Sequence, residues 1–227
     1  MKRIFLFVIF FTAVALNAQS KVNVSNFDKV SAGGSLKVKL VLSDHQGVEY
    51  KMISGEASDL EIKVVSGQLR MNTGNSYFWK KRTKAEIVVY HTGLSGVKAS
   101  AGSSVKSDDV LRAQNMEVGS SSGAYLDVIV DAKTLTADCS SGGTLNLRGK
   151  SQKASLEVSS GGSLDADAHK SMEAVARSSS GGSLSIQVTE GLNAHASSGG
   201  SIRYTGMTST GKLESKTSSG GSVSRMK

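Results

Sequence analysis

The stretch that decides the fold is Ser140-Ser141-Gly142-Gly143-Thr144-Leu145, because it recurs along the chain. Five copies read Ser-Ser-Gly-Gly, any residue, then Leu, Ile or Val, at intervals of 18 to 21 residues. Their glycine pairs are Gly142 and Gly143, Gly161 and Gly162, Gly181 and Gly182, Gly199 and Gly200, and Gly220 and Gly221. Degenerate copies, Ser121-Ser122-Gly123-Ala124 and Ser100-Ala101-Gly102-Ser103, precede them. A near-constant period of about 20 residues is typical of a repeat architecture.

The residues between the tracts alternate between apolar and polar, which predicts strands with one buried face. The third residue after the first glycine is aliphatic in every copy: Val105, Leu126, Leu145, Leu164, Leu184, Ile202 and Val223. We interpret each repeat as a strand, a Ser-Ser-Gly-Gly corner, a second strand and a second turn. Stacking these coils predicts an all-β fold, a right-handed parallel β-helix (solenoid) with rungs of about 20 residues.

The paired glycines are predicted to be structural corner residues. A sharp corner needs positive φ or a close approach of two backbones, and glycine permits both. The two serines before each pair are expected to bond to the turn backbone or to serines of adjacent rungs.

The chain before the regular repeats is also predicted to be β, but less regular. Leu36, Val38, Leu40 and Leu42 alternate with polar or less apolar residues, and turn signals such as Ser66-Gly67 separate similar short runs. We expect residues 22–99 to form irregular N-terminal rungs or a cap, and residues 100–227 to form the regular repeats. Both parts belong to one domain, 19–227.

The first residues have the pattern of a secretory signal peptide. Lys2 and Arg3 precede an apolar run from Ile4 to Leu16, and small residues follow. We predict a signal peptide at 1–18, cleaved after Ala18, and export to the periplasm, the outer-membrane surface or the extracellular space. No second long apolar run exists, so no transmembrane segment is expected in the mature chain.

Composition and spacing exclude several classes of site. The single cysteine, Cys139, rules out an intramolecular disulfide framework and a cysteine-based zinc site, and its position predicts a small buried side chain. The four histidines, His45, His91, His169 and His195, show no metal-ligand spacing, so neither a metal nor a cofactor is expected. The formal net charge is +8, yet no nucleic-acid-binding module is recognisable, so no nucleic-acid partner is expected.

Three features are candidates for function. Asp165 and Asp167 share one face of a strand and could act as acid and base, but a solubilising outer face is the favoured interpretation. Three aromatic residues are followed directly by three basic residues, a combination that can contact a ligand: Tyr77, Phe78, Trp79, Lys80, Lys81 and Arg82. That stretch either contacts a ligand or covers one end of the solenoid. Stacked serines either form a flat face for a repetitive ligand such as a glycan, or serve turn chemistry alone.

The ordered motifs resemble the head GIN domain family, described as putative auto-transporter adhesins. Asn26-Phe27-Asp28-Lys29-Val30 resembles the opening element of the family, and Leu36-Lys37-Val38-Lys39-Leu40 its first core strand. Val65–Met71 resembles a further strand, and Ala85–Tyr90 with Leu94–Gly102 resembles the central strand and glycine-rich corner. The resemblance covers residues 21–227 and implies an exported adhesin of a Bacteroidetes-type bacterium. It supplies no catalytic residues.

We therefore expect an exported, non-enzymatic cell-surface or envelope adhesin or binding protein. It would bind glycans or envelope and surface components through many weak contacts along a repetitive face. The alternatives are a polysaccharide-active enzyme on a β-helix scaffold and a purely structural envelope protein. The last rung has no evident cap, so self-association through its strand edges is also expected.

Overall fold

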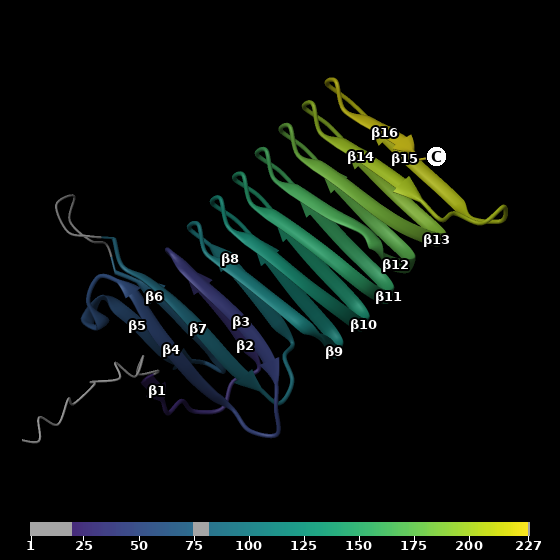
Figure 1. Ribbon diagram of the computed structural model, residues 1–227. Coiled ribbons are helices and arrows are strands. Elements are labelled where there is room, and N and C mark those ends of the chain that lie inside the picture. The colour runs from purple at the N-terminus through teal and green to yellow at the C-terminus, as the bar shows by residue number, and fades with distance from the viewer. Residues whose placement is uncertain (1–19, 75–81, 227) are drawn as a thin grey trace, which may run out of the picture.

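The computed structural model describes residues 20–74 and 82–226, and nearly all its elements are β-strands (Figure 1). The strands are β1 (Ser20–Val22), β2 (Lys29–Gly33), β3 (Leu36–Leu42), β4 (Gly47–Ser54), β5 (Leu60–Val65), β6 (Gln68–Thr73), β7 (Lys84–His91), β8 (Gly96–Ser100), β9 (Ser104–Ser120), β10 (Tyr125–Cys139), β11 (Thr144–Val158), β12 (Ser163–Ser178), β13 (Ser183–Ala196), β14 (Ser201–Thr205), β15 (Lys212–Thr217) and β16 (Ser222–Arg225). One 3-10 turn, η1, spans Ala57–Asp59.

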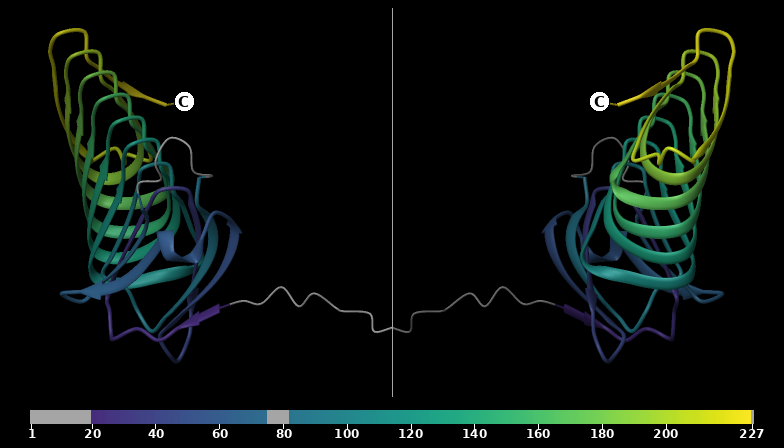
Figure 2. Two further views of the ribbon diagram at one scale, coloured as in Figure 1. Left: turned by 90° about the vertical axis from the view of Figure 1, so that its left-hand side faces the viewer. Right: turned by 90° about the vertical axis from the view of Figure 1, so that its right-hand side faces the viewer.

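The regular half is a parallel β-solenoid, as the repeat predicts. Each strand from β9 to β13 pairs in parallel with the strand one coil later, and β13 pairs with both β14 and β15. The aliphatic residues stack in register, from Val105 through Leu126, Leu145, Leu164, Leu184 and Ile202 to Val223. Figure 2 shows the coils from the two sides as flattened loops of similar outline. The predicted fold class is confirmed.

The second turn of most repeats differs from the prediction. From β9 to β13 each coil bends within one continuous strand, such as the 15-residue β10, whereas the last coil has the predicted break, between β14 and β15. The bend lies where two consecutive side chains, Lys133 and Thr134, both face solvent and the alternation changes phase. Gln152 and Lys153 occupy the same place in β11. Ladder pairing continues on both sides of the bend, so the backbone needs no separate loop there.

The Ser-Ser-Gly-Gly tract forms a two-residue turn with a left-handed backbone. In the tract at 140–143 the central residues Ser141 and Gly142 have φ of 51° and 69°. The Gly143 N–H donates to the Ser140 carbonyl at 2.8 Å. Two consecutive positive φ angles define the type I′ geometry. The prediction of positive φ is confirmed for the first glycine, and the serine before it shares this conformation.

The second glycine of each tract is required for a different reason. Gly162 has an ordinary φ, but a Cβ atom there would lie 2.7 Å from the Cys139 carbonyl oxygen of the preceding coil. At Gly161 a Cβ atom would meet nothing within 4 Å, although φ is +68°. The two roles predicted for the glycine pair are thus divided between its members.

The N-terminal part departs from the pure solenoid. β2 and β3 continue the parallel coils, pairing with β8 and β9. β4 pairs antiparallel with β7 and with β1, and β5 and β6 form an antiparallel hairpin (Figure 1). Phe27 is buried at this end, and its backbone exchanges two hydrogen bonds with the Gln46 amide, at 3.0 and 2.7 Å. These strands form a less regular layer over the first coil.

Candidate functional site

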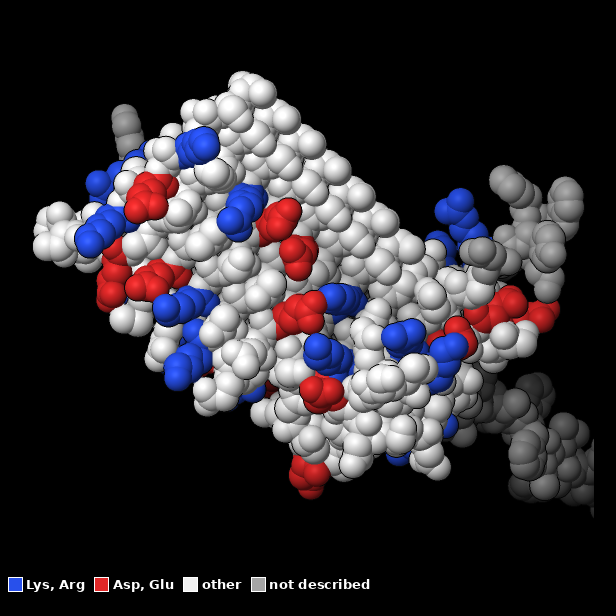
Figure 3. Space-filling model, turned by 180° about the vertical axis from the view of Figure 1, so that it is seen from behind, with Lys and Arg blue, Asp and Glu red and all other residues white. Residues whose placement is uncertain are grey.

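The corner edge of the solenoid carries no charge, whereas the faces carry both signs. The exposed corner positions are serine and glycine in each Ser-Ser-Gly-Gly tract. Figure 3 shows this edge as a broad white band, with lysine, arginine, aspartate and glutamate side chains interspersed on the face below it. Specific polar recognition therefore has to be sought on the faces and at the bend.

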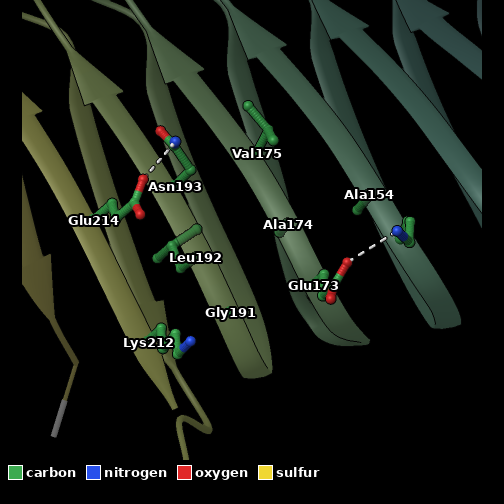
Figure 4. A pocket seen from close by; sticks show the side chains of 10 residues that line it. Ala154, Glu173, Ala174, Val175, Gly191, Leu192, Asn193, Lys212 and Glu214 are labelled. Carbon is green, nitrogen blue, oxygen red and sulfur yellow. Dashed lines mark hydrogen bonds and ion pairs between the residues drawn. The ribbon is translucent and has the colours of Figure 1, made fainter.

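A shallow groove of about 360 Å³ lies on one face of the last coils, across β11, β12, β13 and β15 (Figure 4). Its floor is made of small or aliphatic side chains, Ala154, Ala174 and Leu192, all of which are buried. These residues occupy one interior column, as the alternation predicts. The hollow on the outer face lies where Gly191, which has no side chain, stands between Glu173 and Lys212 of the neighbouring coils.

Polar groups line the rim of this groove on both sides. The Lys153 ammonium lies 3.2 Å from the Glu173 carboxylate, and the Asn193 side-chain amide donates to the Glu214 carboxylate at 3.1 Å (Figure 4). Lys212 lies beside Glu214 at the same rim. Exposed amide, carboxylate and ammonium groups around an apolar floor can hydrogen-bond a hydroxyl-rich ligand. We therefore take this groove as the candidate functional site.

Sequence reasoning missed the rim residues of the groove. They occupy outward positions of the repeat, and the periodicity predicts only that such positions are exposed to solvent. Their proximity follows from the register of β13 with β15, where Asn193 is opposite Glu214. A comparison of the outward columns would have found this pairing, but not the hollow beneath it.

The predicted aromatic and basic stretch is largely outside the described residues. Tyr77, Phe78, Trp79, Lys80 and Lys81 are not described, and only Arg82 is. Arg82 is exposed, and its carbonyl accepts a hydrogen bond from the Ser54 hydroxyl at 2.7 Å. Ligand contact by this stretch stays a prediction.

Asp165 and Asp167 lie on the exposed face of β12, as predicted, but take part in local contacts. The Asp167 backbone N–H donates to the Asp165 carboxylate at 3.0 Å, and the Ser185 hydroxyl donates to it at 3.2 Å. These hydrogen bonds lie near residue 167, where the register of β12 with β11 shifts. This arrangement favours the solubilising interpretation over acid–base chemistry.

A serine and a histidine do meet, but inside the solenoid. His169 Nε2 lies 3.0 Å from the Ser151 hydroxyl, which lies 2.9 Å from the Ser171 hydroxyl. All three residues are buried, and burial lowers the pKa of His169. Substrate has no access to this group, so it serves as a polar contact within the interior at the bend.

The other histidines are dispersed. His91 is buried, neither of its ring nitrogens has a hydrogen-bond partner among the described residues, and burial lowers its pKa. His45 is exposed, bonds Asp44 at 2.8 Å and stacks on Tyr90. His195 lies between Arg177 and Lys216 in one outward column. Among residues 20–74 and 82–226 no group of three His, Cys, Asp or Glu side chains is arranged to hold a metal ion.

Cys139 is buried, in agreement with its predicted inward position. Its thiol lies 3.1 Å from the Gly143 carbonyl oxygen, and burial raises the pKa of the thiol. Both observations describe an unreactive interior side chain.

Carboxylates of three adjacent coils gather on one outward face. Asp138 is opposite Glu157 in the ladder, and Glu117 lies at the neighbouring coil, two residues away in register. Partial burial, together with the Glu157 charge, raises the pKa of Asp138. Glu117 is instead held by the Lys98 and Lys29 ammonium groups, which lower its pKa. This face therefore holds carboxylates and ammonium groups together.

No helix within the described part of the chain is long and apolar enough to cross a membrane.

Comparison with known proteins identifies relatives by fold and by family. The family model described as "Putative auto-transporter adhesin, head GIN domain" matches residues 26–208. A crystal structure of a putative adhesin from Bacteroides fragilis is similar, with a TM-score of 0.81 at 20% identity, covering 92% of this chain and 96% of that one. Two structures from Parabacteroides distasonis cover the same shares of the two chains. One is described as a putative adhesin (TM-score 0.70, 16% identity) and the other as a putative lipid binding protein (0.66, 18%). No curated protein matches the sequence.

Proposed function

We propose that this chain, which belongs to the head GIN domain family, is an exported, non-enzymatic adhesin that binds glycans or other components of a cell surface or envelope. The predicted signal peptide supports export, and the name of the family supports adhesion. The chemistry of the groove on the last coils favours hydroxyl-rich ligands.

The observation that carries the proposal is the repetition of outward positions in successive coils. Parallel register places a hydroxyl at one such position in coil after coil: Thr144, Ser163, Ser183, Ser201 and Ser222. Neighbouring strands are about 4.8 Å apart, so the column presents identical groups at a short, constant spacing. A repetitive ligand that touches several of them gains avidity although each contact is weak.

The environment of the nucleophilic side chains supports a non-enzymatic role. Ser151 and His169 are buried together, and Cys139 is buried with a raised thiol pKa. A nucleophile and its base must reach a substrate in order to act, and these do not.

The first experiment asks where the mature chain lies. Intact producing cells are treated with a protease, with a periplasmic protein as control. Cleavage on intact cells is the expected result. Protection until the outer membrane is opened would remove adhesion to other cells from the proposal and leave a periplasmic role.

The second experiment measures adhesion itself. Beads coated with the mature protein are expected to retain cells or glycan-coated surfaces, and the double variant Asn193→Ala, Glu214→Ala should retain fewer. The matched control is the double variant Asn115→Ala, Glu117→Ala, which removes an amide and a carboxylate from β9, two coils away from Lys153 at the edge of the groove. Equal retention by wild type and both variants would exclude the groove as the contact site.

A further inference from the structure

We propose that a second, lysine-rich groove on the N-terminal coils binds a polysaccharide whose sugars carry carboxylate groups. This inference rests on the proposed function for the class of ligand. It adds a second binding site, separate from the groove on the last coils, and it specifies that the bound glycan is negatively charged. Neither point follows from the family resemblance.

The groove has a volume of about 690 Å³ and lies across β3, β4, β7 and β9. Its lining includes four lysines: Lys37 and Lys39 on β3, Lys51 on β4 and Lys106 on β9. Two carboxylates, Glu86 and Asp108, also line it. Cations therefore outnumber anions by two.

The sheet register holds these lysines close together. The strands follow one another in the order β4, β7, β3, β9. Lys39 is directly opposite Lys106, and Lys37 lies two residues from Lys39 on the same face. Strands are about 4.8 Å apart, and like charges directly opposite each other destabilise a sheet. A bound anion would relieve this repulsion.

The carboxylates of the groove compensate only part of the positive charge. Lys39 lies 3.1 Å from Asp108 and Lys37 lies 3.8 Å from Glu86, and all four side chains are more than half exposed. Exposed pairs of this kind contribute little free energy, so a ligand can compete for the ammonium groups.

The other two lysines, Lys51 and Lys106, have no carboxylate within 4 Å among the described residues. Asp127 is opposite Lys106 in the ladder, but its carboxylate is bound by Arg148 at 2.8 Å. The Asp127 carboxylate is therefore already paired and does not compensate the charge of Lys106.

An aromatic ring flanks the charged groove. The Lys106 ammonium lies 5.3 Å from the centroid of the Tyr125 ring. The Tyr125 hydroxyl accepts a hydrogen bond from the Asn146 amide at 2.9 Å, which fixes the ring. Tyr125 is half-buried and offers an apolar surface with a polar tip beside the cations. Cations next to an aromatic surface suit an acidic sugar, which has a charged group and an apolar ring face.

The test compares two variants with the same change of charge. The groove variant is Lys37→Gln, Lys39→Gln, Lys106→Gln. The control variant is Lys133→Gln, Lys150→Gln, Lys170→Gln, which removes three lysines at the bend. Binding of the mature protein to polygalacturonate is measured, with neutral dextran as the uncharged probe. Wild type should bind polygalacturonate, more weakly as salt rises, and not dextran.

The groove variant should lose about tenfold or more in affinity, a loss of the size expected when several charge contacts are removed together. The control variant should lose no more than about twofold. The variant Lys37→Arg, Lys39→Arg, Lys106→Arg keeps the charge and should keep the binding. An unchanged melting temperature of the glutamine variant shows that its loss of binding does not come from misfolding.

Three outcomes would overturn the inference. They are no binding of polygalacturonate by wild type, an equal loss in the two glutamine variants, and equally tight binding of a short DNA duplex. The last two would mean that net charge alone attracts polyanions. Failure here is distinct from failure of the proposed function, because surface exposure and adhesion of coated beads are measured without polygalacturonate.

Discussion

The two glycines of one corner should respond very differently to the same substitution, alanine. At Gly161 the added methyl group has open space, but φ of +68° is unfavourable for an L residue. At Gly162 the methyl group would lie 2.7 Å from the Cys139 carbonyl oxygen and 2.9 Å from its carbon. Backbone atoms cannot rotate away as a side chain can, so the coils themselves must separate there.

These contacts set the expected magnitudes. A left-handed conformation costs an L residue about 1–2 kcal/mol, and Gly→Ala recovers about 0.4–1 kcal/mol through the unfolded chain. Gly161→Ala should therefore cost about 1 kcal/mol, and Gly161→Val more, because a β-branched residue tolerates positive φ poorly. Gly162→Ala adds overpacking of about 1–3 kcal/mol and weakens corner hydrogen bonds worth about 1 kcal/mol each. Those are Ser159 N–H to the Cys139 carbonyl, at 3.0 Å, and Ser163 N–H to the Gly143 carbonyl, at 2.9 Å.

The assay is thermal unfolding of the mature protein followed by circular dichroism. For a chain of this size 1 kcal/mol shifts the melting temperature by about 2–4 °C. Gly161→Ala should lower it by about 2–4 °C and Gly162→Ala by roughly 6–20 °C. Gly93→Ala is the control, since a Cβ atom there meets nothing within 4 Å and no positive φ is involved. A larger loss for Gly161→Ala than for Gly162→Ala would refute this account of the corner.

Further predictions concern buried groups and the N-terminus. Cys139→Ser should change stability by less than about 1.5 kcal/mol, because Ser120 and Ser178 donate to the equivalent carbonyls at 2.9 and 2.8 Å in their own coils. The native thiol should react with a thiol reagent far more slowly than the unfolded chain, and equal rates would contradict its burial. Burial lowers the pKa of both His91 and His169 from the ordinary value of 6.5. The unfolded chain therefore binds more protons below that pH, so stability is complete above about pH 6.5 and falls as the pH drops through it. His91→Phe, which removes two unpaired ring nitrogens, should flatten the fall in melting temperature between about pH 7 and 5; an unchanged slope would show that His91 does not contribute. Mass spectrometry of the exported protein should find Gln19 as the first residue, and an intact Met1 would contradict signal-peptide cleavage.

The regular coils could be predicted from the repeat, because every coil has to satisfy the same two structural requirements. Leu145, Leu164 and Leu184 must face inward, and a glycine pair must turn the chain between them. These local requirements are visible in any single copy, and recurrence makes them unambiguous. The left-handed serine before each glycine is less visible, because serine rarely adopts positive φ without the turn that surrounds it.

Features that depend on several strands at once are not predictable from periodicity. The bend in β10 is marked only by two consecutive exposed residues, Lys133 and Thr134, which also fit a loop. The antiparallel pairing of β4 with β7 requires contacts between residues 30 to 43 positions apart, without a repeat to indicate the register. Both grooves arise from such registers, so their lysines, carboxylates and amides look like ordinary surface residues in the sequence.

The stacked turns have a consequence for how the gene can vary. Each corner is joined to the next by the same hydrogen bond, a glycine N–H to a serine carbonyl at 3.1 Å, as between Gly142 and Ser160 or Gly161 and Ser180. A duplication of the segment 144–162 would therefore insert one coil whose upper and lower surfaces match those already present. The molecule would lengthen by about 4.8 Å, the distance between neighbouring strands, without any change in its N-terminal layer. The length of the solenoid can thus change in discrete steps, one coil at a time.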